Sequence, residues 1–199
     1  MPKGFSAREK ERIRGSLLEQ GKACFTTYGV KKTNVEDLTK AVGISKGAFY
    51  LFYTSKEELF FEILAEFEDE YHTNLLKTAM QPGTSPRQQV KSFLKQAFTI
   101  WRTHPLFTHF NQEEYEYLLR KLPEDTIQIN LRKDDLFISQ LLSQWREHHV
   151  IIDCDPNMFL SLMRALFFIS LHEHDFGSDM YADVIDFFIE LIAQRLVRE

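Results

Sequence analysis

Three Ser/Thr-x-x-Glu patterns near the start of the chain constrain its fold more than any other feature. They are Ser6–Glu9, Thr33–Glu36 and Ser55–Glu58. In such a capping box the hydroxyl accepts a hydrogen bond from the backbone amide of the glutamate, whose side chain reaches back to the amide of the capping residue. Each pattern therefore predicts a helix start, and three starts before residue 59 predict a densely helical N-terminal segment.

Glycines and a further cap divide this segment into four helices. Gly29 is expected to end the first helix in the left-handed conformation that many helix ends adopt. Gly43 stops the second helix, and Ser45 caps a third from Lys46 to about Tyr53. The helix after Ser55 is long and reaches about Met80.

The remainder of the chain is predicted to be helical as well. Pro86 fits the first turn of a helix to about His104, and a shorter helix follows to about Lys121. Pro123, Asp155-Pro156 and Ser178 mark three later starts. Only 8 Gly and 6 Pro occur in 199 residues, mostly between segments of helical periodicity, so the expected fold class is all-α.

Charge is distributed unevenly along the chain. Residues 1–56 hold 11 lysines and arginines against 5 aspartates and glutamates, whereas residues 57–199 hold 13 against 24. A basic segment on an acidic remainder indicates that one end alone meets a polyanion, and a solvated charged face is the alternative.

Several classes of protein are not favoured by the sequence. The start of the chain has no apolar signal-peptide region, and the longest apolar block, Met158–Leu171, carries Arg164 and is too short to span a bilayer. The two cysteines have no metal or redox spacing, so a reduced, cytoplasmic protein is expected. Catalytic motifs, cofactor motifs and a metal site are not predicted; His109 and Glu113 share a helix face, but no third ligand reinforces them.

The stretch from Val42 to Phe60 combines aromatic residues, two glycines and lysines, and is best explained as the second half of a helix-turn-helix. Gly43 permits the tight bend between its two helices. Phe49 and Tyr53, four residues apart, are expected to anchor the second helix on its inward face. Lys46 and Tyr50 can then reach phosphate oxygens, and small residues at Gly47 and Ala48 let the backbone approach a groove.

These residues resemble the TetR family of bacterial transcriptional regulators. The matching motifs are Phe25-Thr-Thr-Tyr-Gly29, Thr33-x-x-x-x-Leu38-x-x-x-Val42-Gly43 and Ser45-Lys46-Gly47-x-Phe49-Tyr50-x-x-Tyr53-x-Ser55-Lys56-Glu57-Glu58-Leu59. The resemblance covers about residues 9–69, with the motif at about 33–52. It implies an N-terminal three-helix helix-turn-helix domain, residues 1–56, and a helical domain, residues 57–199, that binds a ligand and dimerises.

The resemblance also implies which residues touch DNA. They are Thr33, Ser45, Lys46, Gly47, Ala48, Tyr50, Leu51, Phe52 and Lys56. This sequence departs from the family at Leu51 and Phe52, which are apolar where relatives often carry polar, basic or histidine side chains. Base reading at these two positions is therefore expected to rest on contacts with thymine methyl groups.

A homodimer is expected through two helices near the C-terminus, because both are apolar on nearly all sides and such helices are buried on all sides. The interface is predicted to include Leu162, Leu166, Ile169, Val184, Phe187, Phe188, Leu191 and Ile192. Burial in the core of a single chain is the alternative.

Candidates for a pocket that binds a small hydrophobic effector are mostly aromatic, and an aromatic stripe can equally be ordinary core. They are Trp101, Phe107, Phe110, Tyr115, Phe137, Leu141, Trp145, Met163, Arg164, Phe167 and His172. Arg164, a cation in an apolar run, needs either an internal carboxylate or an anionic ligand. Glu113, Glu114 and Glu116 could receive a cationic ligand or form a solvated face.

The function that combines these features is a repressor that binds a palindromic DNA operator as a homodimer and leaves it when a ligand binds. The alternative is a helical small-molecule carrier or enzyme that retains the DNA-binding segment as a relic. That alternative predicts erosion of the phosphate-contact residues, and Lys46, Tyr50 and Lys56 are all present.

Overall fold

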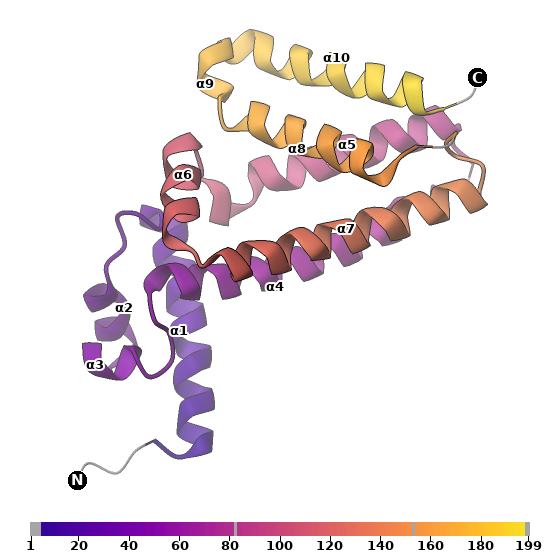
Figure 1. Ribbon diagram of the computed structural model, residues 1–199. Coiled ribbons are helices and arrows are strands. Elements are labelled where there is room, and N and C mark those ends of the chain that lie inside the picture. Colours follow the sequence, from indigo (N-terminus) through magenta and orange to yellow (C-terminus); the bar gives the residue numbers. More distant parts are fainter. Residues whose placement is uncertain (1–4, 82, 153, 198–199) are drawn as a thin grey trace. The chain divides into compact units, whose positions relative to one another are not determined.

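The regular structure is entirely helical in the computed structural model, which describes residues 5–81, 83–152 and 154–197 (Figure 1). This confirms the predicted all-α class. In chain order the elements are α1 Ala7–Tyr28, α2 Val35–Val42, α3 Lys46–Phe49, α4 Lys56–Thr78, α5 Pro86–Thr103, η1 Pro105–Phe107, α6 Gln112–Lys121, α7 Glu124–Glu147, α8 Pro156–Ser170, α9 Glu173–Phe176 and α10 Ser178–Leu196.

The helices form two compact units, and their division does not follow the predicted boundary at residue 56. One unit, called the head unit here, contains Met1–Glu68 and Pro105–Leu122. The other, called the body unit, contains Asp69–His104 and Pro123–Glu199. The helix α4 begins in the head unit and continues into the body unit, and the segment with η1 and α6 belongs to the head unit.

The three predicted capping boxes differ in outcome. At Ser6 both hydrogen bonds form: the hydroxyl accepts from the Glu9 amide at 3.3 Å, and the Glu9 carboxylate accepts from the Ser6 amide at 2.8 Å. The second box is wrong by one residue, because Asn34 caps α2 and accepts from the Asp37 amide at 2.9 Å.

The third box forms by half. The Ser55 hydroxyl accepts a hydrogen bond from the Glu58 amide at 3.1 Å, as predicted. The Glu58 carboxylate, however, accepts from the amide and hydroxyl of Thr54 instead of the Ser55 amide. The start of α4 is therefore fixed by Ser55 as predicted, and the Glu58 carboxylate extends the hydrogen bonding one residue further back, to Thr54.

The core of the head unit lies between α1 and α4. Gly21 of α1 marks their closest approach, because a Cβ atom at this position would lie 2.8 Å from the Ile63 side chain. Phe25 meets Phe60 edge to face with 5.5 Å between ring centroids. Tyr28, the last residue of α1, lies outside this core and is exposed.

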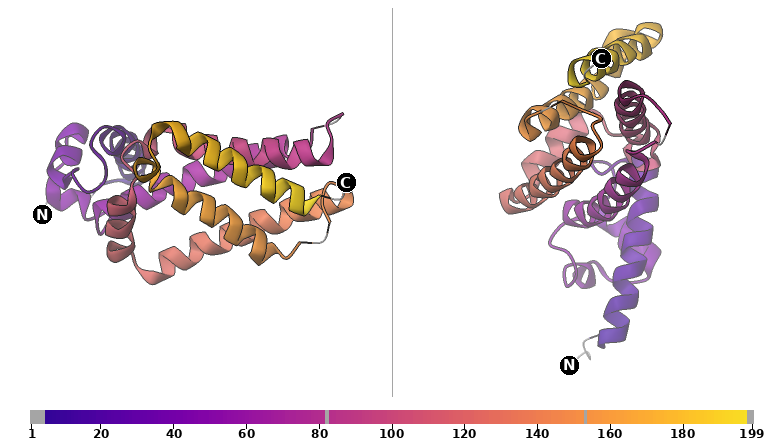
Figure 2. Two further views of the ribbon diagram at one scale, coloured as in Figure 1. Left: turned by 90° about the horizontal axis from the view of Figure 1, so that it is seen from above. Right: turned by 90° about the vertical axis from the view of Figure 1, so that its right-hand side faces the viewer.

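The core of the body unit is built around Trp145 of α7, which is completely buried. Its indole N–H donates to the carbonyl of Ala79 at 3.2 Å, and its ring meets Phe93 and Phe159 edge to face. In this unit α10 packs along α5, and α8 packs on α7 (Figure 2). Of the helices in the described ranges, none has the length and apolar character needed to cross a membrane.

Candidate nucleic-acid interface

The turn between α2 and α3 has the geometry of a helix-turn-helix. Gly43 adopts the left-handed conformation, with φ 76° and ψ 33°, and its amide donates to the Thr39 carbonyl at 2.9 Å. Ser45 then caps α3, since its hydroxyl accepts from the Ala48 amide at 3.1 Å. The left-handed Gly43, followed after one residue by the capping Ser45, lets the chain reverse within three residues between the end of α2 and the start of α3.

The recognition helix is shorter than predicted. Regular α-helix ends at Phe49, and single turns continue the coil through hydrogen bonds from the amides of Phe52 and Tyr53 to the Phe49 carbonyl. Phe49 is fully buried and Tyr53 is 3% exposed, so both are inward anchors as predicted. The centroids of their two rings lie 5.9 Å apart. Burial of two aromatic side chains holds this short segment in place far better than its own backbone bonds would.

Most of the remaining residues of this segment face solvent. Leu51 is 71% exposed and Tyr50 is 50% exposed. Ser45, Lys46 and Gly47 are exposed as well, whereas Ala48 is partly covered. Phe52 is also partly covered, and its ring lies 6.1 Å from that of Phe5. The exposed Leu51 is therefore available for contact with a partner. Phe52 is partly available as well, but its side chain also packs near Phe5.

Lys46, the first residue of α3, forms an ion pair with Glu36 of α2. The distance from Nζ to Oε1 is 2.7 Å, and both side chains are more than half exposed. The hydrogen bond to Glu36 raises the pKa of Lys46 above its ordinary value. The lysine is thus charged and accessible, but it already has an internal counter-charge.

Two of the predicted DNA-contact residues, Thr33 and Lys56, are engaged in hydrogen bonds inside the head unit. Thr33 is 2% exposed, and its hydroxyl donates to the Gly29 carbonyl at 2.7 Å. The Lys56 ammonium donates to the carbonyls of Val30, Lys31 and Thr33 at 2.6, 3.0 and 2.5 Å, and burial lowers its pKa. An ammonium has three N–H donors, so these three carbonyls satisfy Lys56 fully. Both residues serve the connection between α1 and α2.

The same connection is held from the other side by α6. The buried Glu114 carboxylate accepts hydrogen bonds from the amides of Val30 and Lys31, the latter at 3.0 Å. Gly29 allows this approach: its φ is 78°, and a Cβ atom there would lie 3.1 Å from Glu114 Oε1. The Nε2 atom of His109 lies 2.9 Å from the carbonyl oxygen of Thr27. A buried carboxylate that caps two amides fixes the turn before α2.

Sequence reasoning missed this role of Glu114. It grouped Glu114 with Glu113 and Glu116 as a solvated or ligand-binding face, but Glu113 pairs with Lys31 at 3.3 Å and Glu116 is exposed. The signal that could have separated them is register, because Glu114 lies four residues before the buried Leu118 on one face of α6. The hydroxyl of Tyr117, on the same helix, donates a hydrogen bond to the buried Glu57, and burial raises the pKa of Tyr117.

The predicted pocket residues do not belong to one unit. Phe107, Phe110 and Tyr115 lie in the head unit, where the Phe110 ring packs against the other two and against Phe60. Trp101, Phe137, Leu141, Trp145, Met163, Arg164, Phe167 and His172 lie in the body unit. Leu141 and Trp145 are completely buried as core, and Trp101 meets Phe167 edge to face at 5.2 Å. His172 pairs with Asp175 on the surface.

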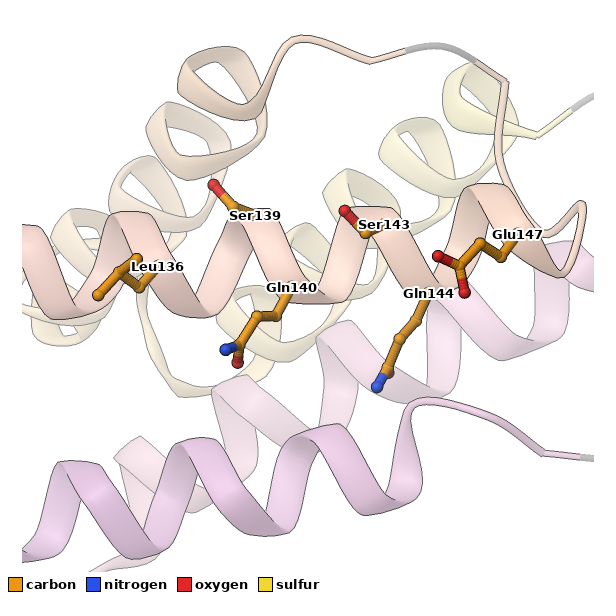
Figure 3. A pocket seen from close by; sticks show the side chains of 6 residues that line it. All are labelled: Leu136, Ser139, Gln140, Ser143, Gln144 and Glu147. Atoms are coloured by element: carbon orange, nitrogen blue, oxygen red, sulfur yellow. The ribbon is translucent and has the colours of Figure 1, made fainter.

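A hollow on the body unit lies elsewhere, along one side of α7 (Figure 3). It is lined by Leu136, Ser139, Gln140, Ser143, Gln144 and Glu147. Sequence reasoning selected none of these residues. Because one helix supplies the whole lining and most of the lining residues are polar by type and exposed, the hollow is not an enclosed pocket of the kind that a hydrophobic effector needs.

Arg164 acts on a carboxylate inside the body unit. Burial raises the pKa of Asp134 to about 6, against the opposing effect of the Arg164 charge. His72 lies beside this carboxylate, with 3.6 Å between Nε2 and Oδ1, and stacks on Phe137 with 4.2 Å between centroids. Burial lowers the pKa of His72 to about 4. Arg164 is thus close enough to this internal carboxylate to act on its charge.

The predicted dimer residues fall into exposed and covered groups. Phe187, Phe188 and Leu191 are 63%, 41% and 45% exposed, whereas Leu166 is buried in the body unit. The remaining four, Leu162, Ile169, Val184 and Ile192, are partly covered. One side of α10 thus packs inside the unit while the other presents apolar side chains to solvent, so these helices are not buried on all sides within one chain.

In the described part of the chain, no group of three or more His, Cys, Asp or Glu side chains lies close enough together to hold a metal ion. The pair considered from the sequence is divided, since His109 contacts the Thr27 carbonyl and Glu113 pairs with Lys31.

Comparisons with known proteins agree with the geometry of the head unit. Residues 17–63 match the family model described as bacterial regulatory proteins, tetR family. An uncharacterized HTH-type transcriptional regulator of Bacillus subtilis, YhgD, is 28% identical over 76% of this chain and 78% of its own length. The HTH-type transcriptional repressor KstR2 of Mycobacterium tuberculosis is 22% identical over 86% of each chain.

The fold of the whole chain also resembles that of a solved TetR-family structure. A TetR-family transcriptional regulator from Pectobacterium atrosepticum superposes with a TM-score of 0.71 and 16% identity, over 98% of this chain and 99% of the other. Family model, relatives and fold agree with the anchored recognition helix after Gly43. The chain therefore resembles the TetR family of DNA-binding transcriptional regulators in its helix-turn-helix segment and in its fold.

Proposed function

We propose that this regulator is a repressor, that it binds a palindromic operator as a homodimer in the cytoplasm, and that a small hydrophobic molecule releases it. The observation that carries the proposal is the recognition segment after Gly43. Phe49 and Tyr53 anchor it from within, while Lys46, Tyr50 and Leu51 remain exposed on its outer side. An anchored helix with an exposed cation and an exposed apolar side chain suits phosphate contact and base reading in the major groove.

The proposed contacts differ from those that the family resemblance implies. Lys46 and Tyr50 would reach phosphates, Leu51 and Phe52 would meet base edges, and Ser45, Gly47 and Ala48 would allow close approach of the backbone. Thr33 and Lys56 are left out of this set, because hydrogen bonds within the head unit occupy both. Their proposed task is to hold the α1–α2 connection so that α2 and α3 keep a fixed position.

The homodimer is supported by the exposed apolar side chains of α10. Phe187, Phe188 and Leu191 follow the helical spacing of one face, and together they form an apolar surface on a body unit that is otherwise acidic. A second copy that packs the same face against this one would cover it. Two copies present two recognition segments, and a palindromic operator matches that symmetry.

Release by an effector would follow from differential binding. A ligand that binds the body unit better in one conformation shifts the population toward that conformation, and DNA affinity falls if the two recognition segments are then wrongly spaced. The repressor role is supported by the name of the Mycobacterium relative. The alternative of a carrier or enzyme with a relic DNA-binding segment is disfavoured, since Lys46 and Tyr50 are present and exposed.

Selection of DNA fragments by the purified protein, followed by sequencing, tests this proposal. The expected result is one enriched inverted repeat with half-sites about one helical turn apart. Recovery of fragments with no common sequence would overturn it, and recovery of unpaired half-sites would overturn the homodimer. Small hydrophobic compounds can then be screened for release of the selected fragment.

A further inference from the structure

We propose that Glu36 competes with DNA phosphate for Lys46, and so limits the affinity of this regulator for DNA of any sequence. Glu36 would be a positioning residue that acts through Lys46. The inference rests on the proposed use of the α2–α3 segment to bind DNA, and it names a side chain outside the set of predicted DNA contacts.

The geometry places the two charges on the outer side of the helix-turn-helix. Glu36 is the second residue of α2, and Lys46 is the first residue of α3; the two helices lie next to each other (Figure 1). The ion pair therefore bridges them. The distance of 2.7 Å between Nζ and Oε1 is that of a charge-assisted hydrogen bond. The side chains are 53% and 67% exposed for Lys46 and Glu36, so a phosphate has access to both.

The charge balance of this segment supports the competition. Residues 34–53 contain two cations, Lys40 and Lys46, and two anions, Glu36 and Asp37, so the motif has no net charge although residues 1–56 are basic. Both anions lie in the first turn of α2. A helix N-terminus ordinarily attracts phosphate through its free N–H groups, and carboxylates there have the opposite effect.

The strength of the ion pair is suitable for exchange. An exposed pair contributes little free energy, so DNA can displace the carboxylate. When Lys46 turns to a phosphate, however, Glu36 is left without its partner beside a polyanion. DNA binding therefore gains less free energy from Lys46 than it would from a lysine without an internal counter-charge. Since phosphate contacts supply nearly all of non-specific affinity, the effect should be visible on random DNA.

The test is a double-mutant cycle on random-sequence duplex DNA, with binding titrated over a range of salt concentrations. Glu36→Gln keeps the shape of the side chain and removes its charge. The expected result is about 2–5-fold tighter binding at low salt, the fold-change that corresponds to an exposed ion pair, with a steeper salt dependence. In a Lys46→Ala background the same substitution should change the affinity much less.

Asp37→Asn is the matched control, because it removes a neighbouring charge from the same turn of α2. It should strengthen binding less than Glu36→Gln, and its effect should be the same in the parent protein and in the Lys46→Ala background. Equal effects of Glu36→Gln in both backgrounds would overturn the inference, as would weaker binding by Glu36→Gln. If the parent protein binds no DNA at all, the proposed function fails instead, so the two failures are distinct.

Discussion

The head unit and the body unit expose different chemistry for different reasons. In the head unit, buried anchors and capped turns fix a few exposed side chains: Phe49 is fully buried two residues before Leu51, which is 71% exposed. In the body unit, Phe187, Phe188 and Leu191 of α10 are exposed apolar side chains, and the titratable side chains of Asp134 and His72 are partly buried. The head unit buries its aromatic anchors within one chain, whereas the body unit leaves an apolar face that the proposed homodimer would cover.

The largest expected effect concerns that apolar face. Phe188→Glu should abolish the homodimer, because a charge placed in a desolvated apolar seam has no partner and costs several kcal/mol, about the penalty for an unpaired buried charge. Sedimentation velocity would measure the oligomeric state. Phe188 is 41% exposed in the single chain, so the variant should still fold.

The control for this variant is Leu136→Glu, which changes an apolar residue of α7 that is 65% exposed and lies outside the predicted interface. It should leave the dimer intact. If both variants remain dimeric, the interface lies on another surface, and the proposed contrast between the two units is lost.

The next effect tests whether the head unit is held by internal hydrogen bonds. Glu114→Ala should destabilise it by about 1–3 kcal/mol, because the buried amide of Val30 loses its acceptor; the partly buried amide of Lys31, which loses the same acceptor, can turn to water. Chemical denaturation measures the change in the free energy of unfolding. Glu116→Ala, at an exposed position of the same helix, should change it very little.

A loss of stability confined to Glu114→Ala would support the role of α6 as part of the head unit. Equal and small effects of the two substitutions would show that water replaces the carboxylate, and that the α1–α2 connection is held without it.

A smaller effect is expected from Asp134 in the body unit. Its pKa is raised to about 6, so the ionised form is disfavoured in the folded protein, and its contribution to stability is lost as pH rises from about 4 to about 6. The pKa of His72 is lowered to about 4, so its contribution is lost in the opposite direction, as pH falls from about 6.5 to about 4. In the parent protein these two dependences offset each other.

Asp134→Asn removes the pH dependence of stability that comes from Asp134. The variant should be more stable than the parent at pH 7 by about 1–2 kcal/mol, a range reduced for the partial exposure of this carboxylate. Its stability should then fall more steeply on acidification, because His72 is no longer offset. Denaturation from pH 4 to 8 measures both, with the exposed neighbour Asp135→Asn as control. Lower stability of Asp134→Asn at pH 7 would show that the attraction of Arg164 outweighs the cost of burial.

The sequence predicted the head unit well where the signal was local. The start of α1 at Ser6, the bend at Gly43 and the inward faces of Phe49 and Tyr53 all depend on neighbours within a few residues. It did not predict the internal partners of Thr33 and Lys56, whose polar groups bond to the chain between α1 and α2. Types of residue show which contacts are possible, but not which internal acceptor reaches them first.

Most of what the sequence could not show depends on contacts between distant segments. Glu114 meets Val30 across more than eighty positions of sequence, and Arg164 influences Asp134 from a different helix. The aromatic residues proposed for one pocket were chosen by type alone, and they divide between the two units. Helical periodicity predicts which side of a helix is covered, but not what covers it.

The most direct test of the central claim is the ratio of operator to random-DNA affinity for Leu51→Ala. If Leu51 reads a thymine methyl group, its loss should weaken operator binding by about 1 kcal/mol, the lower end of the range for a base contact, and leave random-DNA affinity and salt dependence nearly unchanged. Lys46→Ala is the companion variant, expected to weaken both kinds of binding alike and to reduce the salt slope by about one unit. Because Leu51 is 71% exposed, the melting temperature of the Leu51→Ala variant should match that of the parent. A Leu51→Ala variant with the parent's affinity ratio would contradict the account.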